Sequence, residues 1–116
     1  RKTGALFRAC VRIGGLLGGA DEAALARLTE YATAFGEAFQ IVDDILDVIG
    51  DTAEMGKRAG SDARQGKVTV PGLIGIDAAR RLAAEETERA VASLAGFGRQ
   101  ADLLRWLARR VLARRR

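Results

Sequence analysis

Several residue types are scarce in this 116-residue chain, and each scarcity excludes a class of structure. The single cysteine, Cys10, cannot form an internal disulfide. One proline and few aromatic residues, beside many Ala, Leu, Arg and Glu, are typical of an all-α protein. Because Cys10 lies inside an apolar helical pattern, we expect it to be a buried core thiol.

Long hydrophobic runs are also missing. No stretch approaches the ~18 consecutive apolar residues of a membrane-spanning helix, and the first residues lack the ordered regions of a secretory signal. We therefore expect one compact domain in the cytoplasm, without stable insertion into a membrane.

Positive charge is concentrated between Arg99 and Arg116, where seven arginines face one acid, Asp102. A basic helix can indicate binding to nucleic acid or to an anionic membrane, and this remains an alternative reading. No aromatic interleaving or nucleic-acid motif accompanies the charge, so we expect no nucleic-acid partner.

Apolar spacing predicts two long helices in the first half of the chain. The first covers residues 2–17 and ends at Gly18 and Gly19. Its expected buried stripe is Ala5, Leu6, Ala9, Cys10, Ile13, Leu16 and Leu17. The second begins after an N-cap at Asp21, runs from Glu22 to about Ile49 and stops at Gly50. Its expected inward residues are Leu25, Leu28, Tyr31 and Phe35.

The second half is predicted to contain a long loop and two more helices. Four glycines and mixed charges over residues 50–66 indicate a loop, and loops of this length are usually functional or disordered. A helix then starts with Asp77 as its cap and closes at Gly96 and Gly98. In the last helix the expected inward residues are Leu103, Leu104, Leu107 and Val111.

The second helix carries an acidic face. At about 100° per residue, Gln40, Asp43, Asp44 and Asp47 share an arc of about 100°, while a continuous apolar face lies opposite. A solvated polar face is the simplest explanation. It is disfavoured because aspartates near a helix C-terminus, two of them at i and i+4, each cost a few tenths to about 1 kcal/mol.

These penalties suggest a compensating cation. Oxygen donors without His or Cys favour Mg²⁺ or Ca²⁺, and the alternating acidic loop of an EF-hand is missing. Glycines interspersed with Lys57 and Lys67 follow in the chain and could approach an anion closely. Together the two features indicate Mg²⁺ bridging to phosphate oxygens.

The run from Phe39 to Asp47, with the Gly-Lys pairs 56–57 and 66–67 and Asp62 after it, resembles the second aspartate-rich region of trans-isoprenyl diphosphate synthases, the polyprenyl synthetases. Similarity is greatest to the bacterial farnesyl and geranylgeranyl diphosphate synthases. The opening segment 2–6 is similar to the Lys-Thr segment of the same family. The resemblance implies the C-terminal helices of the class I isoprenoid synthase bundle.

The resemblance also implies roles for individual residues. Asp43, Asp44 and Asp47 would bind Mg²⁺, with Asp62 in an outer, water-mediated position. The diphosphate of the allylic substrate would be held by Lys2, Thr3, Gln40, Lys57 and Lys67. Arg116, in the closing Arg114–Arg116 run, would help to cover the isopentenyl diphosphate site, and Gly36 would leave space beside the reacting chain.

The family's first aspartate-rich motif has no counterpart in this sequence. We therefore expect residues 1–116 to be the C-terminal portion of a polyprenyl synthetase domain, inactive alone, and a homodimer in the full-length protein. The expected reaction joins an allylic diphosphate to isopentenyl diphosphate, giving a C15 or C20 product. A non-catalytic helical subunit of an active synthase is the alternative, and a terpene cyclase fits the lysine-bearing segments less well.

Overall fold

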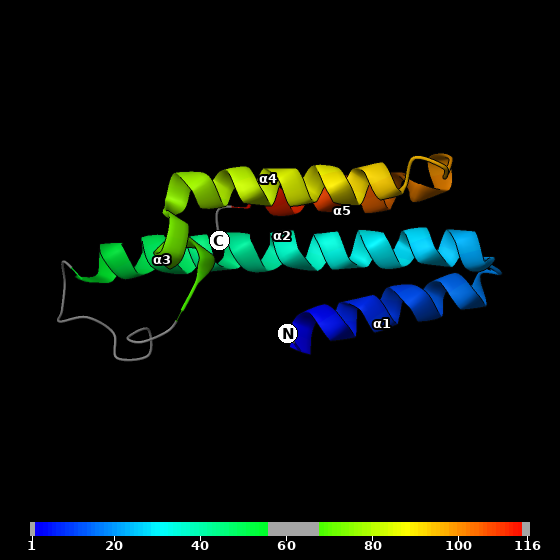
Figure 1. The fold of residues 1–116 in the computed structure, drawn as a ribbon, viewed down its shortest axis with the longest axis horizontal. Coiled ribbons are helices and arrows are strands. Elements are labelled where there is room, and N and C mark those ends of the chain that lie inside the picture. Colours follow the sequence, from blue (N-terminus) through cyan, green and yellow to red (C-terminus); the bar gives the residue numbers. More distant parts are fainter. Residues whose placement is uncertain (1, 56–67, 115–116) are drawn as a thin grey trace.

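The computed structural model describes residues 2–55 and 68–114, and in these ranges the chain is an antiparallel array of helices (Figure 1). The elements are α1 (Lys2–Leu17), α2 (Glu22–Met55), α3 (Val70–Ile74), α4 (Ile76–Ser93), a 3-10 turn (Arg99–Ala101) and α5 (Asp102–Leu112). No strand occurs among the described residues, so the all-α prediction is confirmed. No helix within them is both long and apolar enough to cross a lipid bilayer.

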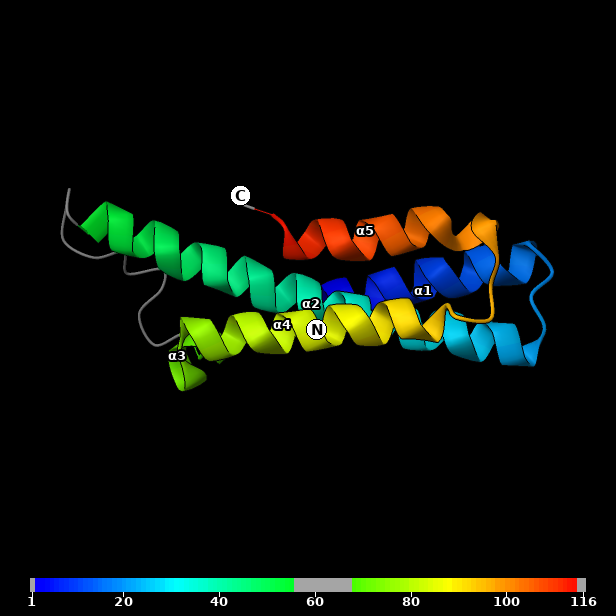
Figure 2. The same cartoon turned by 90° about the horizontal axis from the view of Figure 1, so that it is seen from above.

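Helix α2 is the centre of the fold and contacts α1, α3, α4 and α5. Helices α4 and α5 lie along one side of it and α1 along another (Figures 1 and 2). The N-cap predicted at Asp21 is present, because the Ala24 amide donates to its Oδ1 at 2.8 Å. Gly19, with φ of 84°, reverses the chain just before this cap.

Two predicted boundaries are wrong. Helix α2 continues through Gly50 to Met55, because one glycine weakens a helix by only about 1 kcal/mol and the flanking residues support it. The first part of the expected loop is therefore helical, and its remainder lies outside the described residues. Helix α4 is capped by Gly75, with φ of 87°, so Asp77 lies in the first turn, near the positive end of the helix dipole.

The short helix α3 is fixed by local hydrogen bonding. The Thr69 side chain accepts from the Gly72 amide at 3.1 Å, and Pro71 occupies an early helical position, where no amide donor is needed. Pro71 is buried, and Gly75 then directs the chain into α4. This turn places α3 beside both α2 and α4.

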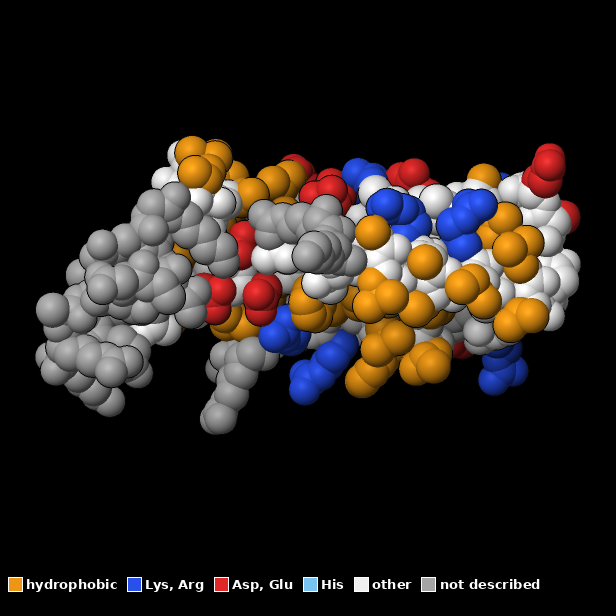
Figure 3. All heavy atoms as spheres, turned by 90° about the horizontal axis from the view of Figure 1, so that it is seen from below, with side chains coloured by type: hydrophobic (Ala, Val, Ile, Leu, Met, Phe, Trp, Pro, Cys, Tyr) orange, Lys and Arg blue, Asp and Glu red, His pale blue; other side chains and the backbone are white. Residues whose placement is uncertain are grey.

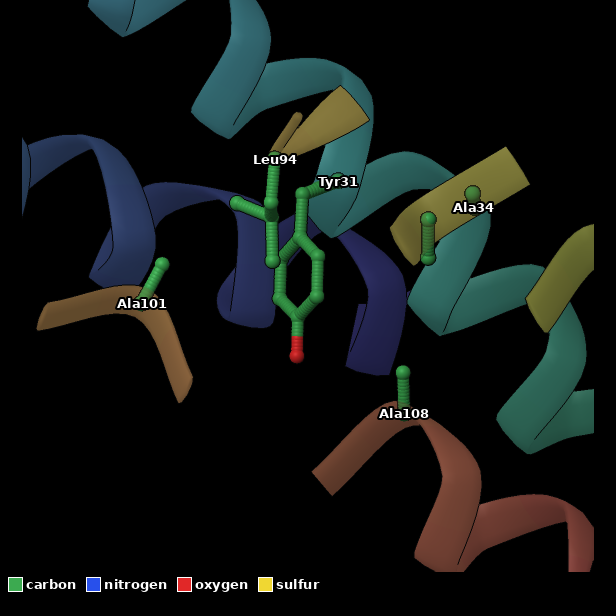
Figure 4. Packing of buried hydrophobic residues seen from close by; sticks show 6 residues of the cluster. Tyr31, Ala34, Leu94, Ala101 and Ala108 are labelled. Carbon is green, nitrogen blue, oxygen red and sulfur yellow. The ribbon is translucent and has the colours of Figure 1, made fainter. Parts of the chain in front are cut away.

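The core consists of two clusters strung along α2. In the first, Tyr31 is fully buried between Leu94, Ala101 and Ala108 (Figure 4). Its hydroxyl donates to the Leu104 carbonyl at 2.7 Å. The buried members of this cluster are Tyr31, Ala34, Ala90, Leu94, Ala101 and Ala108. The second cluster lies beside the acidic segment of α2. Its buried members are Ile41, Val42, Ile45, Ala79, Ala83 and Val111.

The predicted inward stripe of α1 is wrong, and Cys10 is exposed rather than buried. Within the described part, α1 packs on α2 alone, and its inner face is formed by Gly4, Phe7, Val11 and Gly15. The more apolar stripe is left outside, with Leu6 66% exposed. On α5, Leu103 is also 66% exposed, while the expected inward residue Val111 is buried.

Candidate functional site

Three carboxylates gather on one face of α2. Asp43, Asp44 and Asp47 can each offer an oxygen atom such that all three lie within 4.8 Å of one another. The i, i+1, i+4 spacing produces this cluster, as the sequence predicted. Hard oxygen donors at this separation suit Mg²⁺, so the residues fit that ion.

Asp44 is the inner member of the cluster. It is 1% exposed, whereas Asp43 and Asp47 are partly exposed. The Gln40 amide donates to Asp44 Oδ1 at 3.0 Å, one helical turn away. A buried carboxylate requires such donors, and this bond fixes the side chain's orientation.

A cavity of about 130 Å³ lies beside the cluster, between α1 and α2, with Val70 at its edge. The predicted residues Thr3, Gln40 and Asp44 all line it, and so does Gly36. A Cβ atom built on Gly36 would lie 3.6 Å from the Gly4 Cα, so the two helices cross closely here. The structure thus brings the start of α1 and the acidic segment of α2 to one cavity.

Other predicted site residues fall outside what is described. Lys2 is the first residue of α1, but its side chain lies outside the described part. Lys57, Asp62, Lys67 and Arg116 lie outside the described residues. Their roles remain predictions.

The sequence reasoning missed two charged residues that line the cavity, Arg8 and Glu37. Arg8 follows Gly4 at i+4, and Glu37 lies three residues before Gln40, so helical spacing alone could have placed both near the site. The wrong choice of inner stripe for α1 concealed Arg8, which lies on the half-buried face.

An aromatic column stands beside the cavity. The Phe7 and Phe35 rings stack with centroids 4.4 Å apart, and the Phe35 and Phe39 centroids are 6.4 Å apart. The Arg114 guanidinium lies over the Phe39 ring at 4.8 Å, and its Nη2 is 3.8 Å from Asp43 Oδ1. The end of α5 therefore reaches the edge of the carboxylate cluster.

Comparison with known proteins gives one consistent result. The family model described as polyprenyl synthetase matches residues 1–102. Farnesyl diphosphate synthase of Escherichia coli is 49% identical over 85% of this chain and 33% of its own length. Dimethylallyltranstransferase of Fischerella ambigua is 45% identical over 97% of this chain and 33% of its own length.

A solved structure has the same arrangement of helices. The apo crystal structure of a FPP/GFPP synthase from Zymomonas mobilis superposes with a TM-score of 0.80 at 38% identity, covering 95% of this chain and 34% of that one. The chain therefore spans about a third of the length of the relatives it matches.

Proposed function

The chain belongs to the polyprenyl synthetase family, and on this premise we propose that it forms one metal- and diphosphate-binding half of a prenyltransferase active site. The whole site would join an allylic diphosphate to isopentenyl diphosphate and release a C15 or C20 isoprenyl diphosphate. The observation that carries the proposal is the position of the carboxylate cluster beside a cavity lined by Thr3 and Gln40.

In the proposed reaction, the bond between C1 and oxygen of the allylic diphosphate breaks, and its electron pair leaves with the diphosphate. The double bond of isopentenyl diphosphate attacks C1, and a proton is then lost. Bound Mg²⁺ ions supply positive charge where negative charge develops on the departing diphosphate.

The chain's own residues would organise that departure. Asp43, Asp44 and Asp47 would hold the ions, and Gln40 would keep the buried Asp44 carboxylate in place. Thr3 lines the cavity and can donate a hydrogen bond to a phosphate oxygen. We propose the same diphosphate-binding role for Lys2, Lys57 and Lys67, with Asp62 assisting at the metals and Arg116 at the isopentenyl diphosphate.

We propose that residues 1–116 are the C-terminal portion of the family domain, since the chain spans about a third of the length of its relatives and its sequence contains the family's second aspartate-rich region without the first. The remaining metals and isopentenyl diphosphate would then be bound by the rest of the domain, and this portion alone would be inactive. The full-length enzyme would be a cytoplasmic homodimer.

A replacement experiment tests the proposal. In the E. coli relative, the third that matches this chain is replaced by residues 1–116. Chain elongation by the hybrid enzyme is then assayed with dimethylallyl or geranyl diphosphate, isopentenyl diphosphate and Mg²⁺. We expect a C15 or C20 product. Asp43→Asn should lower kcat/KM by about 100-fold or more, as when one group that stabilises transition-state charge is lost.

The matched control is Glu85→Gln at an exposed position of α4, which removes one negative charge outside the cluster and should leave the rate unchanged. Unaltered turnover and Mg²⁺ dependence in Asp43→Asn would refute the assigned role of the cluster.

The exposed apolar face of α1 favours a second candidate, a non-catalytic helical subunit that docks on an active synthase. Under this alternative, the exchanged enzyme would show no elongation with any pair of substrates. The isolated chain would instead co-purify with an intact synthase and alter its rate.

A further inference from the structure

We propose that Arg114 is a built-in counter-ion of the carboxylate cluster, which competes with the divalent cation for Asp43 and moves away when the cation binds. The inference rests on the proposed function, because it assumes that the cluster binds metal. It adds a positioning residue, next to the end of α5, whose position depends on whether the carboxylate cluster holds a cation.

The end of α5 is held in place next to α2. Val111 is buried in the second core cluster with Ile41, Val42 and Ile45. Beyond it, the Arg114 amide donates to the Val111 carbonyl at 3.1 Å, so a turn follows the last residues of the helix. The packing of α5 on α2 therefore places the Arg114 guanidinium beside the carboxylate cluster.

Two contacts on α2 receive the guanidinium. Phe39 and Asp43 are one helical turn apart and share a face. The cation lies over the Phe39 ring, 4.8 Å from its centroid, while Nη2 approaches the Asp43 carboxylate at 3.8 Å. The side chain is 26% exposed, so the pair is only partly screened by water.

The geometry favours exchange over permanent pairing. A distance of 3.8 Å is longer than the ~2.7–2.9 Å of a charge-assisted hydrogen bond, so the Nη2–Oδ1 contact is an ion pair without a hydrogen bond. A cation that takes Asp43 as a ligand removes that attraction and repels the guanidinium. A wide groove between α2, α4 and α5, also lined by Arg114, gives the displaced side chain room to move.

The energetic consequence is a penalty on metal binding. Before the cation arrives, Arg114 offsets part of the repulsion among three neighbouring carboxylates, and that benefit is lost on loading. In a medium with the dielectric constant of water, and with screening by physiological salt, one unit charge this close to a ligand of a divalent ion changes the affinity for that ion by about three- to tenfold.

The test measures Mn²⁺ binding to the full chain, without phosphate, by electron paramagnetic resonance of the free ion. We expect Arg114→Gln to bind Mn²⁺ about three- to tenfold more tightly, and Arg114→Lys to remain near the original chain. The control, Arg110→Gln, removes an exposed arginine of the same helix and should change affinity less than about twofold.

A second measurement uses the original chain and does not depend on any variant folding well. The Nε–Hε resonance of Arg114, assigned by its absence in Arg114→Gln, is followed during a Mg²⁺ titration. It should move in proportion to metal saturation. Saturation without movement of this resonance would overturn the proposal.

The possible outcomes distinguish failure of this inference from failure of the proposed function. If the original chain binds Mn²⁺ and Arg114→Gln binds equally or more weakly, the counter-ion role is wrong and the carboxylate site stands. If neither protein binds Mn²⁺, even after inorganic diphosphate is added to complete the metal's ligands, the carboxylate site itself is wrong, and this inference falls with it.

Discussion

Arg105 closes the C-terminal end of α4 although it belongs to α5. Its Nη2 donates to the carbonyls of Leu94 and Phe97 at 2.9 and 2.6 Å, and its Nη1 donates to the carbonyl of Gly98 at 3.0 Å. An ion pair with Asp102 at 2.8 Å holds the guanidinium in place. One side chain thus supplies donors to the C-cap carbonyl of α4, Leu94, and to two carbonyls of the turn that follows it.

Replacing Arg105 should therefore destabilise the fold. We expect Arg105→Ala to lower the free energy of unfolding by about 2 kcal/mol, since hydrogen bonds to a charged donor are lost and helix-end carbonyls lose their partner. Urea denaturation measures this. Arg109→Ala, at an exposed position of the same helix, should stay within about 0.5 kcal/mol. Equal effects of the two variants would contradict the capping role.

Tyr31 is a second residue with a defined energetic role. Burial raises the pKa of its phenol above the ordinary value of 10.0, so the folded chain holds it neutral. Tyr31→Phe should cost about 1 kcal/mol at neutral pH, because the bond to the Leu104 carbonyl is lost.

The pH dependence of this cost has a definite sign. Above pH 10 the unfolded chain ionises Tyr31 while the folded chain does not, so the stabilisation from the neutral phenol is complete below that pH and declines above it. The stability advantage of the original chain over Tyr31→Phe should shrink as pH rises, by up to about 1.4 kcal/mol per pH unit. An advantage that is constant from pH 9 to 11 would contradict this.

At the scale of elements, two glycines in different backbone states make a matched pair. Gly50 lies inside α2 with open space around its Cα, so Gly50→Ala should stabilise the chain by about 0.5–1 kcal/mol. Gly19 has φ of 84°, so Gly19→Ala should destabilise it by about 1–2 kcal/mol. Thermal unfolding followed by circular dichroism compares them, and effects of the same sign would contradict the assigned conformations.

Helix α2 shows what sequence can predict here. Its N-cap at Asp21, its buried Tyr31 and the cluster of Asp43, Asp44 and Asp47 all follow from local chemistry and helical periodicity. These features depend on residues within one helix. The continuation past Gly50 did not follow, because the small cost of one glycine is outweighed by its neighbours.

Helix α1 shows where such prediction fails. Hydrophobicity predicts that the face containing Leu6 and Leu16 is buried, yet the face against α2 is the one where Gly15 permits close approach. A Cβ atom on Gly15 would lie 2.9 Å from the Leu28 side chain. The choice between two helical faces depends on which neighbours exist, and a single helix's sequence does not contain that information.

At the scale of the whole molecule, the described part is elongated, measuring 53 × 23 × 20 Å. Hydrophobic side chains gather on the face that includes α1 (Figure 3). On α1, Leu6, Ile13, Leu16 and Leu17 are each more than half exposed. A contiguous apolar surface of this kind promotes association.

We expect the isolated chain to associate with increasing concentration. Leu6→Glu combined with Leu16→Glu should shift it toward monomer in sedimentation velocity runs, with little change in thermal stability, because both side chains are already exposed. The control is Ala26→Glu with Ala92→Glu, which adds the same charge at exposed positions of α2 and α4. Equal dissociation by both pairs would attribute the effect to net charge.

Gly4 and Gly36 line the cavity where α1 and α2 cross, so a substitution at Gly36 would change the separation of the two helices there. A methyl group on Gly36 would touch Gly4 without displacing it, whereas a branched side chain on Gly36 would have to push the helices apart. Side chains of increasing size at Gly36 would therefore change the space that Gln40 lines in steps, while the carboxylates of α2 keep their register.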